Sequence, residues 1–369
     1  MAVTIQNVAT SAMKANHLKA LIVQARSDGQ TVYTGAFGES MTGVPATADM
    51  HFRNGAISFT YMATLLLEFV DRKKTTLDTK LSKYFPGLPD ADRITLRNLA
   101  QMTSGYVDYV YQPEVINGTY RDPFHAWPSD ELISIGVSKP LQFAPGTNWG
   151  YSHTNYVILG RVLEKIAGVP LADAIRQNIL ERVGLTQTQA GSTASIPAPV
   201  LHSFSSERRE VLGIPPANPF YEEATFWNPS WTTIDGAIET TDVRDAALSI
   251  EAVATGKLLT KESSEQQIAA SLVGFGHAQS GCPACRANNE AFNYGLGVIR
   301  FGAWVAQTLG FAGASGAVGY LPSRKLTIAV EVTNGQGAYN DEGNAASGAN
   351  VVFRDLANAL APGSFPKLP

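Results

Sequence analysis

The strongest hydrophobic pattern in the chain lies between residues 56 and 70. Apolar side chains recur there every three or four residues, which is the spacing of one face of an α-helix. Leu65 and Leu67 add apolar residues on the flanks, and Asn54 and Gly55 interrupt regular structure just before the pattern begins. We therefore predict a helix from residue 56 onward that is buried on nearly all sides.

Strand-like sequences occur near both ends of the chain. Residues 18–26 and 31–37 are of this kind, and the Ser-Asp-Gly-Gln sequence between them is typical of a hairpin turn. Near the other end, three antiparallel strands are expected at residues 294–300, 316–322 and 326–332. We expect all of these strands to form one antiparallel sheet.

Helical spacing and loop-forming residues account for most of the remaining chain. Helices are expected at residues 8–16, 157–167, 241–254 and 349–360, and loops at residues 106–130, beside a cleft, and 190–235. Strands at both ends and helices in the middle indicate an α+β fold. We divide it into a discontinuous sheet domain, residues 1–75 and 241–369, and a mainly helical insertion domain, residues 76–240.

The composition of the 369 residues is that of a globular protein with a sizeable core. Hydrophobic residues make up 44% and charged residues 16%, and the net charge of −4 gives no reason to expect a nucleic-acid or anionic-membrane partner. No run of about 18 apolar residues is present, so we expect no membrane span. The first residues lack the pattern of a signal peptide, which fits a cytoplasmic protein or a trimmed mature start.

The two cysteines, Cys282 and Cys285, lie three positions apart in a loop-like sequence. A zinc site would need two further ligands, and only His277 is close in sequence. We therefore rank a small structural disulfide first, two free thiols second, and redox or metal chemistry last. We expect no metal and no other cofactor.

Residues 52–60, Phe-Arg-Asn-Gly-Ala-Ile-Ser-Phe-Thr, resemble the opening of the catalytic helix in the family of serine β-lactamases, penicillin-binding proteins and class C-like carboxylesterases, where the pattern is F-R-x-G-S-x-x-K-T. Residues 76–86, 94–105 and 143–156 are similar to further segments of that family, in the same order. The resemblance implies a β-lactamase/DD-peptidase-like fold, in which an antiparallel sheet is flanked by helices and carries a helical insertion domain. In that family the Ser is the acylated nucleophile, and the Lys helps to take up its proton.

The two positions that carry this chemistry in the family are Ala56 and Phe59 in this chain. Neither side chain can attack a carbonyl carbon or accept a proton. Ser58 lies two residues after Ala56, so at about 100° per residue it points to roughly the opposite side of the helix. Ser152 is expected to face away from the cleft. The resemblance thus implies the fold without serine acylation.

The other two family motifs are also altered. The Tyr-x-Asn motif corresponds to Tyr151 and His153, and the Lys/His-Thr-Gly motif corresponds to residues 307–309, Gln-Thr-Leu. Without a neighbouring Lys, the pKa of Tyr151 should stay near the ordinary value of about 10, so that its phenol donates a hydrogen bond. His153 can accept a proton, and the pair would then perform general acid–base catalysis. The alternative is a packing Tyr with a His at the rim of the cleft.

The replacement of two positively charged side chains of the family changes which ligand the cleft is expected to bind. Phe59 and Gln307 stand where the family has positive charges, so a buried carboxylate would lack a partner, and we expect a neutral, largely apolar small molecule. The residues expected to contact it are Ala56, Phe59, Gln307, Thr308, Tyr109 and Trp149, with Tyr106, Tyr111 and His125 as further candidates.

Three functions follow as hypotheses. The first is an enzyme without an acyl intermediate, such as an isomerase, cyclase, lyase or direct-water hydrolase, with Tyr151 as donor and His153 as acceptor. The second is a catalytically inactive protein that binds a ligand or a partner. The third is residual esterase or amidase activity, which would need an unrecognised nucleophile. Lost turnover with retained binding in Tyr151→Phe and His153→Ala would distinguish the first from the second.

Overall fold

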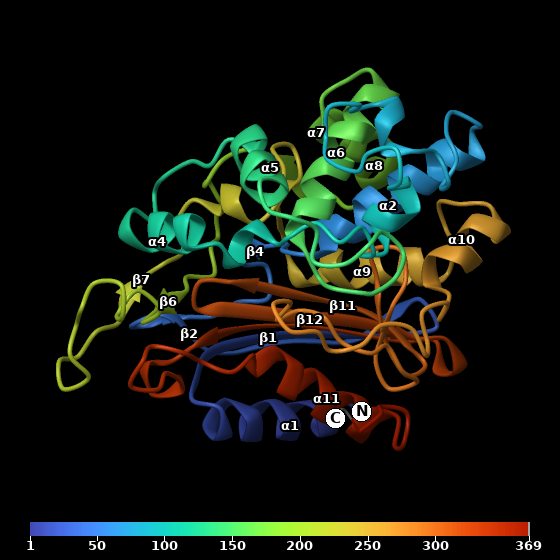
Figure 1. Cartoon of the computed structure of the whole chain (residues 1–369). Helices are drawn as coiled ribbons and strands as arrows, with labels where there is room; N and C mark the ends of the chain where they lie inside the picture. Colours follow the sequence, from blue (N-terminus) through green and yellow to red (C-terminus); the bar gives the residue numbers. More distant parts are fainter. Residues whose placement is uncertain (368–369) are drawn as a thin grey trace.

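The computed structural model describes residues 1–367 and has one large antiparallel sheet at its centre (Figure 1). Its eight strands follow the order β3-β2-β1-β13-β12-β11-β10-β9. The strands are β1 (Leu18–Ser27), β2 (Gln30–Met41), β3 (Val44–Pro45), β9 (Asn293–Tyr294), β10 (Ile299–Phe301), β11 (Trp304–Phe311), β12 (Ala314–Leu321) and β13 (Leu326–Asn334). Strands from both ends of the chain meet in the middle of the sheet, as predicted from their sequence patterns.

A two-residue turn joins β1 to β2. Asp28 and Gly29 both have positive φ, 49° and 76°, and Ser27 pairs with Gln30 across the turn. Two successive left-handed residues match the right-handed twist of a hairpin, and Asp and Gly adopt this conformation more readily than most residues. The hairpin expected from the Ser-Asp-Gly-Gln sequence is confirmed.

The centre of the sheet is covered on both faces. β1 pairs with β13 so that Leu21 lies opposite Val332 and Val23 opposite Val330. All nine residues of β13 are buried. Strands that are buried on both faces carry nearly continuous hydrophobic runs, and this explains the apolar character of residues 326–334.

Two helices, α1 (Ala2–Ala15) and α11 (Gly348–Leu360), cover one face of the sheet and are drawn below it in Figure 1. Phe353 of α11 packs edge-to-face on Trp304 of β11, with ring centroids 5.3 Å apart. α1 begins earlier than the expected residue 8, because the buried Ile5 extends its apolar face by a turn.

Two further helices, α2 (Ile57–Asp71) and α9 (Val243–Ala254), lie on the opposite face of the sheet (Figure 1). Every residue of α2 from position 57 to position 69 is buried. Several polar side chains of α2 have partners inside the protein; for example, Tyr61 Oη and Ser249 Oγ of α9 share a hydrogen bond of 2.5 Å. The helix predicted to be buried on nearly all sides is confirmed.

A mainly helical region follows α2 and lies above the sheet in Figure 1. Its main helix, α6 (His153–Ala167), ends at Gly168, whose φ of 73° forms the predicted C-terminal cap. The other helices are α3 (Leu96–Ala100), α4 (Pro113–Arg121), α5 (Ser129–Val137), α7 (Leu171–Ile175) and α8 (Glu181–Val183), and α10 (Lys261–Ile268) follows α9. Small sheets are formed by β4 (Phe52–Arg53), β8 (Ile238–Thr241) and β5 (Gln189–Gly191), and by β6 (Phe204–Ser205) with β7 (Glu222–Glu223). The division into two domains stays a prediction.

The expectation of one irregular loop at residues 106–130 is wrong, because α4 occupies part of it. Gly118 of α4 lies so close to Trp127 that a Cβ there would come within 2.6 Å of the indole ring. The Trp127 Nε1 donates a hydrogen bond of 3.1 Å to Thr119 Oγ1. Packing against Trp127 therefore outweighs the weak helix propensity of this sequence.

Cys282 and Cys285 form the disulfide that was ranked first. Both sulfurs are buried beside Phe143, and Cys285 pairs with Gly150 through an isolated β-bridge. The disulfide therefore holds its loop against the chain just before Tyr151. No helix within residues 1–367 combines the length and the apolar character that a bilayer crossing requires.

Candidate functional site

A cavity of about 500 Å³ lies where the start of α2 meets β11 and the start of α6. Its walls include Ala56, Phe59, Tyr151, His153, Thr308 and Glu207. The first five are residues that the sequence assigned to the site, and three separate regions of the chain supply them. The predicted convergence of α2, the Tyr151 region and β11 on one cleft is therefore present in the structure.

The close approach of β11 to the start of α2 depends on Gly55. Its φ is 54°, and a Cβ at this position would lie 3.0 Å from Leu309 Cα and 3.1 Å from Leu309 Cβ. A residue with a Cβ would combine a strained backbone with too short a contact. Ala56 is the N-cap of α2 and is thereby held beside β11.

Phe59 forms an apolar wall of the cavity at the position where the resemblance places a Lys. Its ring stacks on Tyr156, with centroids 4.2 Å apart and planes 13° apart. The ring centroids of His153 and Tyr151 lie 5.8 Å and 6.2 Å from that of Phe59. Aromatic packing thus fills the space beside Ala56, and no base is present at this position.

A buried carboxylate orients His153. The Nδ1 atom of His153 lies 3.0 Å from Oδ2 and 3.2 Å from Oδ1 of Asp108, and the backbone N–H of His153 donates to Oδ1 at 3.2 Å. The Asp108 side chain is 5% exposed and that of His153 is 20% exposed. A carboxylate at Nδ1 keeps the proton on that nitrogen, so Nε2 of the neutral ring is the acceptor. Within residues 1–367, Nε2 has no hydrogen-bond partner.

Asp108 was not among the residues selected from the sequence. It precedes His153 by 45 positions and lies in the segment expected to be a loop. Its local role is to cap the short turn Tyr109–Tyr111, where Oδ1 accepts a hydrogen bond of 3.2 Å from Val110 N. Asp is common at such caps, so the sequence contains no signal that connects it to His153.

Tyr151 presents a neutral phenol to the cavity. Its ring centroid lies 5.3 Å from that of His153, with the planes 78° apart. Burial raises the pKa of Tyr151 well above its usual range, and the neighbouring Tyr294 and Asp108 raise it further. The expectation that this pKa stays near 10 is therefore wrong, and the role of Tyr151 as a donor stays a prediction.

Three residues expected to contact the ligand do not line the cavity. Gln307 is 1% exposed, and its amide is used internally, because Nε2 donates to Gly297 O at 3.0 Å and Oε1 accepts from Thr308 N at 2.9 Å. Trp149 is fully buried against Tyr294 and Phe292. Tyr109 is also fully buried, and its ring lies 6.0 Å from the imidazole of His153 as a support behind it. The prediction that these three residues contact the ligand is therefore wrong, and their side chains pack around the site instead.

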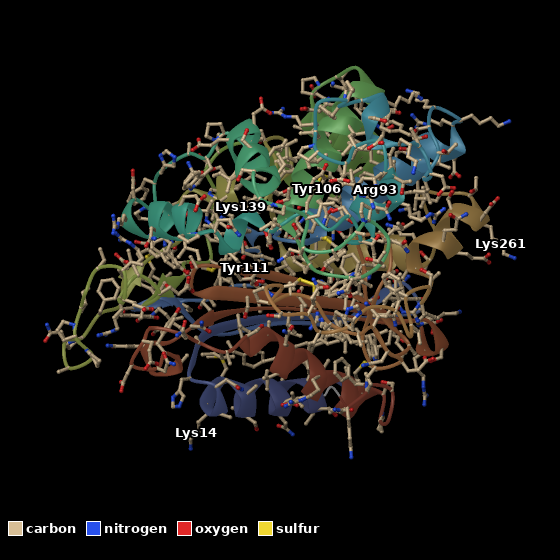
Figure 2. All side chains as sticks on the ribbon, in the orientation of Figure 1. Lys14, Arg93, Tyr106, Tyr111, Lys139 and Lys261 are labelled. Carbon is tan, nitrogen blue, oxygen red and sulfur yellow. A yellow bond between two sulfur atoms is a disulfide. The ribbon has the colours of Figure 1, made fainter. Side chains whose placement is uncertain are left out.

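The further candidates also lie outside the cavity. Tyr106 is buried and donates its phenol proton to Pro89 O at 2.5 Å. Tyr111 is 56% exposed and, with Lys139, lines a separate cavity of about 420 Å³ that also reaches Tyr151. Figure 2 labels the side chains of Tyr111 and Lys139. His125 is exposed and packs edge-to-face on Trp127. Their place in a Tyr-rich segment did not reveal that these three side chains lie outside the cavity.

The serines near the site lack a base. Ser58 and Ser152 are each 1% exposed and do not line the cavity. Ser315 and Ser347 line it, but within the described residues neither hydrogen-bonds to a His, a Lys or a carboxylate. A serine hydroxyl without an adjacent base is a weak nucleophile at neutral pH.

No metal centre is formed by the described part of the chain. Within residues 1–367, His, Cys, Asp and Glu side chains do not gather in groups of three or more with the geometry to hold a metal ion.

The chain is similar in sequence to proteins named as penicillin-binding proteins and as D-alanyl-D-alanine carboxypeptidases. The family described as Beta-lactamase matches residues 5–351. Penicillin-binding protein 4 of Amycolatopsis lactamdurans is 31% identical over 153 residues, which cover 40% of this chain and 38% of that protein. Penicillin-binding protein 4* of Bacillus subtilis (strain 168) is 28% identical over 184 residues, which cover 49% of this chain and 40% of that protein. The matched part therefore spans about two fifths of the length of these relatives.

Solved structures share the whole fold. The D-stereospecific amidohydrolase from Streptomyces sp. superposes with a TM-score of 0.79 at 22% identity, over 98% of this chain and 99% of that one. Other sequence relatives are named as D-alanyl-D-alanine carboxypeptidases and as an esterase. Because the family match extends over nearly the whole sequence and the sheet, flanking helices and helical region agree with it, the chain belongs to the beta-lactamase family.

Proposed function

We propose that the protein is a hydrolase that adds water to an amide or ester bond without an acyl-enzyme intermediate. The hydrogen bond between Asp108 and His153 carries the proposal, because it leaves Nε2 as a proton acceptor at the cavity wall. Relatives named as carboxypeptidases and an esterase support hydrolysis over isomerase, cyclase or lyase chemistry.

In the proposed mechanism, Nε2 of His153 removes a proton from a water molecule as its oxygen attacks the carbonyl carbon. Tyr151 donates a hydrogen bond to the carbonyl oxygen, where negative charge develops. The bond to the leaving nitrogen or oxygen then breaks, and the proton on His153 passes to the leaving group. Asp108 stabilises the imidazolium that forms in between and keeps the ring in position. One water is consumed, and all groups of the protein return to their starting states.

The absence of a Ser-Lys acylation dyad is part of the proposal. Ala56 and Phe59 line the cavity at the start of α2, and neither can form a bond to a carbonyl carbon. Water is therefore the nucleophile that the cavity can supply.

The walls support a substrate whose reacting end is uncharged and largely apolar. Phe59, Leu309 and Phe311 form apolar parts of the cavity wall. Within residues 1–367, no Lys or Arg lines the cavity. A substrate carboxylate would therefore be desolvated without a cationic partner.

Steady-state hydrolysis of a panel of uncharged esters and anilides tests the proposal. We expect His153→Gln to lower kcat by about 10²–10⁴-fold, the usual scale for one general base. His125→Gln is the matched control, because His125 is exposed and lies outside the cavity. Burst release of one equivalent of product before the steady state would contradict the proposal, since it reports an acyl-enzyme.

The second candidate is a binding protein without turnover. The internal use of Gln307 and the missing nucleophile–base pair favour it, because much of the catalytic machinery of the family is then replaced by packing. Tight binding of a panel compound, together with no hydrolysis above the rate of His153→Gln, would establish this candidate and refute the first.

A further inference from the structure

The cavity has a carboxylate that the proposed mechanism does not use. Glu207 follows β6, in the segment that the sequence predicts to be a loop, and it lines the cavity together with His153. We propose that Glu207 binds the ammonium group of an amine-bearing ligand. The inference deepens the proposed function, and it rests on that function only for treating the ligand as a substrate.

Backbone and side-chain donors hold the Glu207 carboxylate in place. Oε1 accepts a hydrogen bond of 3.2 Å from Gly313 N in the turn between β11 and β12, and Oε2 accepts a long one of 3.4 Å from Tyr120 Oη. The backbone N–H of Glu207 donates to Ser205 Oγ at 3.0 Å. A carboxylate offers about four lone pairs, so these bonds position the group and leave acceptor capacity toward the cavity.

Glu207 has no cationic partner within residues 1–367. The nearby arginines are used elsewhere: Arg208 binds the carboxylate of Glu222 at 3.0 Å, Arg209 donates to Pro215 O at 2.7 Å, and Arg53 donates to Ser195 O at 3.3 Å. Burial raises the pKa of Glu207, although its hydrogen bonds act in the opposite direction. A partly buried carboxylate beside a cavity is stabilised most by a cation that the ligand brings.

Aromatic side chains beside Glu207 would also attract the ammonium group of such a ligand. Trp231 and Phe311 stack with ring centroids 6.1 Å apart and planes 20° apart, and both line the cavity. The negative face of an aromatic ring attracts an ammonium group, and the attraction grows when water is excluded. Acid and aromatic groups together, without a Lys or Arg in the walls, favour a cation over an anion or a neutral polar group.

The amine site lies away from the reacting end. β11 passes the start of α2 at Leu309 and ends at Phe311, just before the turn that holds Glu207. At about 3.3 Å per residue these two steps span about 7 Å. A ligand that reaches both ends therefore has an uncharged reacting group and an amine separated by an apolar body.

Isothermal titration calorimetry with two matched probes tests the inference without requiring turnover. The probes are 2-phenylethylamine and 2-phenylethanol, which differ in charge and hardly in shape. We expect the wild-type protein to bind the amine about 10- to 100-fold more tightly, the scale of one hydrogen bond to a charged group. Glu207→Gln should remove this preference and leave the affinity for the alcohol unchanged.

Glu210→Gln is the control variant, because Glu210 is an exposed acid of the same segment and does not line the cavity. It should keep the preference for the amine, and thermal melting should show that both variants are folded. Equal affinities of the two probes for the wild type, tighter binding of 3-phenylpropanoate, or no amine binding at millimolar concentration would overturn the inference. Amine binding by a protein that hydrolyses nothing would refute the proposed function alone, and hydrolysis without any amine preference would refute this inference alone.

Discussion

Asp108 and His153 stand 45 residues apart in the sequence and share a hydrogen bond of 3.0 Å between Oδ2 and Nδ1. The carboxylate is turned into the protein, and the imidazole keeps its other nitrogen for the cavity. This arrangement orients a base beside Phe59 and Ala56, where the resemblance places a Lys and a nucleophilic Ser.

Asp108→Asn should lower kcat by about 10²–10⁴-fold with little change in KM, because an amide no longer fixes the proton on Nδ1 or stabilises the imidazolium. The measurement is steady-state kinetics on the substrate identified in the hydrolysis panel. Asp108→Glu should recover part of the lost kcat. A change confined to KM would instead mark Asp108 as a residue that shapes the binding site.

Tyr151→Phe should lower kcat by a similar factor of about 10²–10⁴, because the phenol that stabilises the developing charge is removed. Burial raises the pKa of Tyr151 well above its usual range, so the active, protonated form persists as pH rises. The pH profile of kcat should therefore show no alkaline loss through the ordinary range of a tyrosine, up to about pH 10. Loss of activity between about pH 8 and 10 that disappears in Tyr151→Phe would show that the phenol ionises and would contradict this assignment.

The protein should form no covalent adduct with penicillins or fluorophosphonates, because among residues 1–367 the cavity has no serine with an adjacent base. Intact-mass spectrometry after incubation measures this directly. Ala56→Ser alone should remain unreactive, since Phe59 supplies no base, and a penicillin-acylated member of the family serves as the positive control. A stoichiometric adduct on Ser58, Ser152 or Ser315 would refute the expectation.

Gly55→Ala should destabilise the fold by about 1–3 kcal/mol and weaken ligand binding, because the added Cβ meets Leu309 and the backbone has a φ of 54°. Gly43→Ala is the matched control, since Gly43 also has a positive φ, 75°, and a Cβ there meets nothing within 4 Å. Urea unfolding of both variants separates the backbone strain from the close contact. Equal losses in the two variants would show that the contact with Leu309 relaxes freely.

Stability should fall as pH rises because of Glu239. This carboxyl is 3% exposed, and burial raises its pKa from 4.5 to about 8, against a hydrogen bond of 2.6 Å from Asn54 Nδ2. The folded state therefore holds a proton that the unfolded state releases between these values. The stabilisation is complete below pH 4.5 and is lost as pH rises through about 8, by about 3–5 kcal/mol in all.

Urea unfolding of the wild type and of Glu239→Gln at a series of pH values tests this prediction. The Gln side chain keeps the shape and does not titrate, so its curve should be flatter between pH 4.5 and 8. Parallel curves for the two proteins would assign the pH dependence to other groups.

Much of the fold could be predicted from the sequence because helices and strands depend on residues that are close in the chain. The spacing of apolar residues located the buried helix α2, and the Ser-Asp-Gly-Gln sequence located the turn between β1 and β2. Gly168 ended α6 as predicted. The helix α4 was missed because it is stabilised by Trp127, a contact outside its own sequence window.

The sequence by itself determined which reactive side chains the chain contains. It also determined that Ala56, Phe59, Tyr151, His153 and Thr308 lie near one cleft. Only the tertiary structure decided that Gln307, Trp149 and Tyr109 are packing residues, and that Asp108 and Glu207 enter the site. The reason is physical: whether a side chain faces a cavity, and which charge it meets there, depends on how elements distant in sequence pack together, and no local pattern of residues encodes that contact.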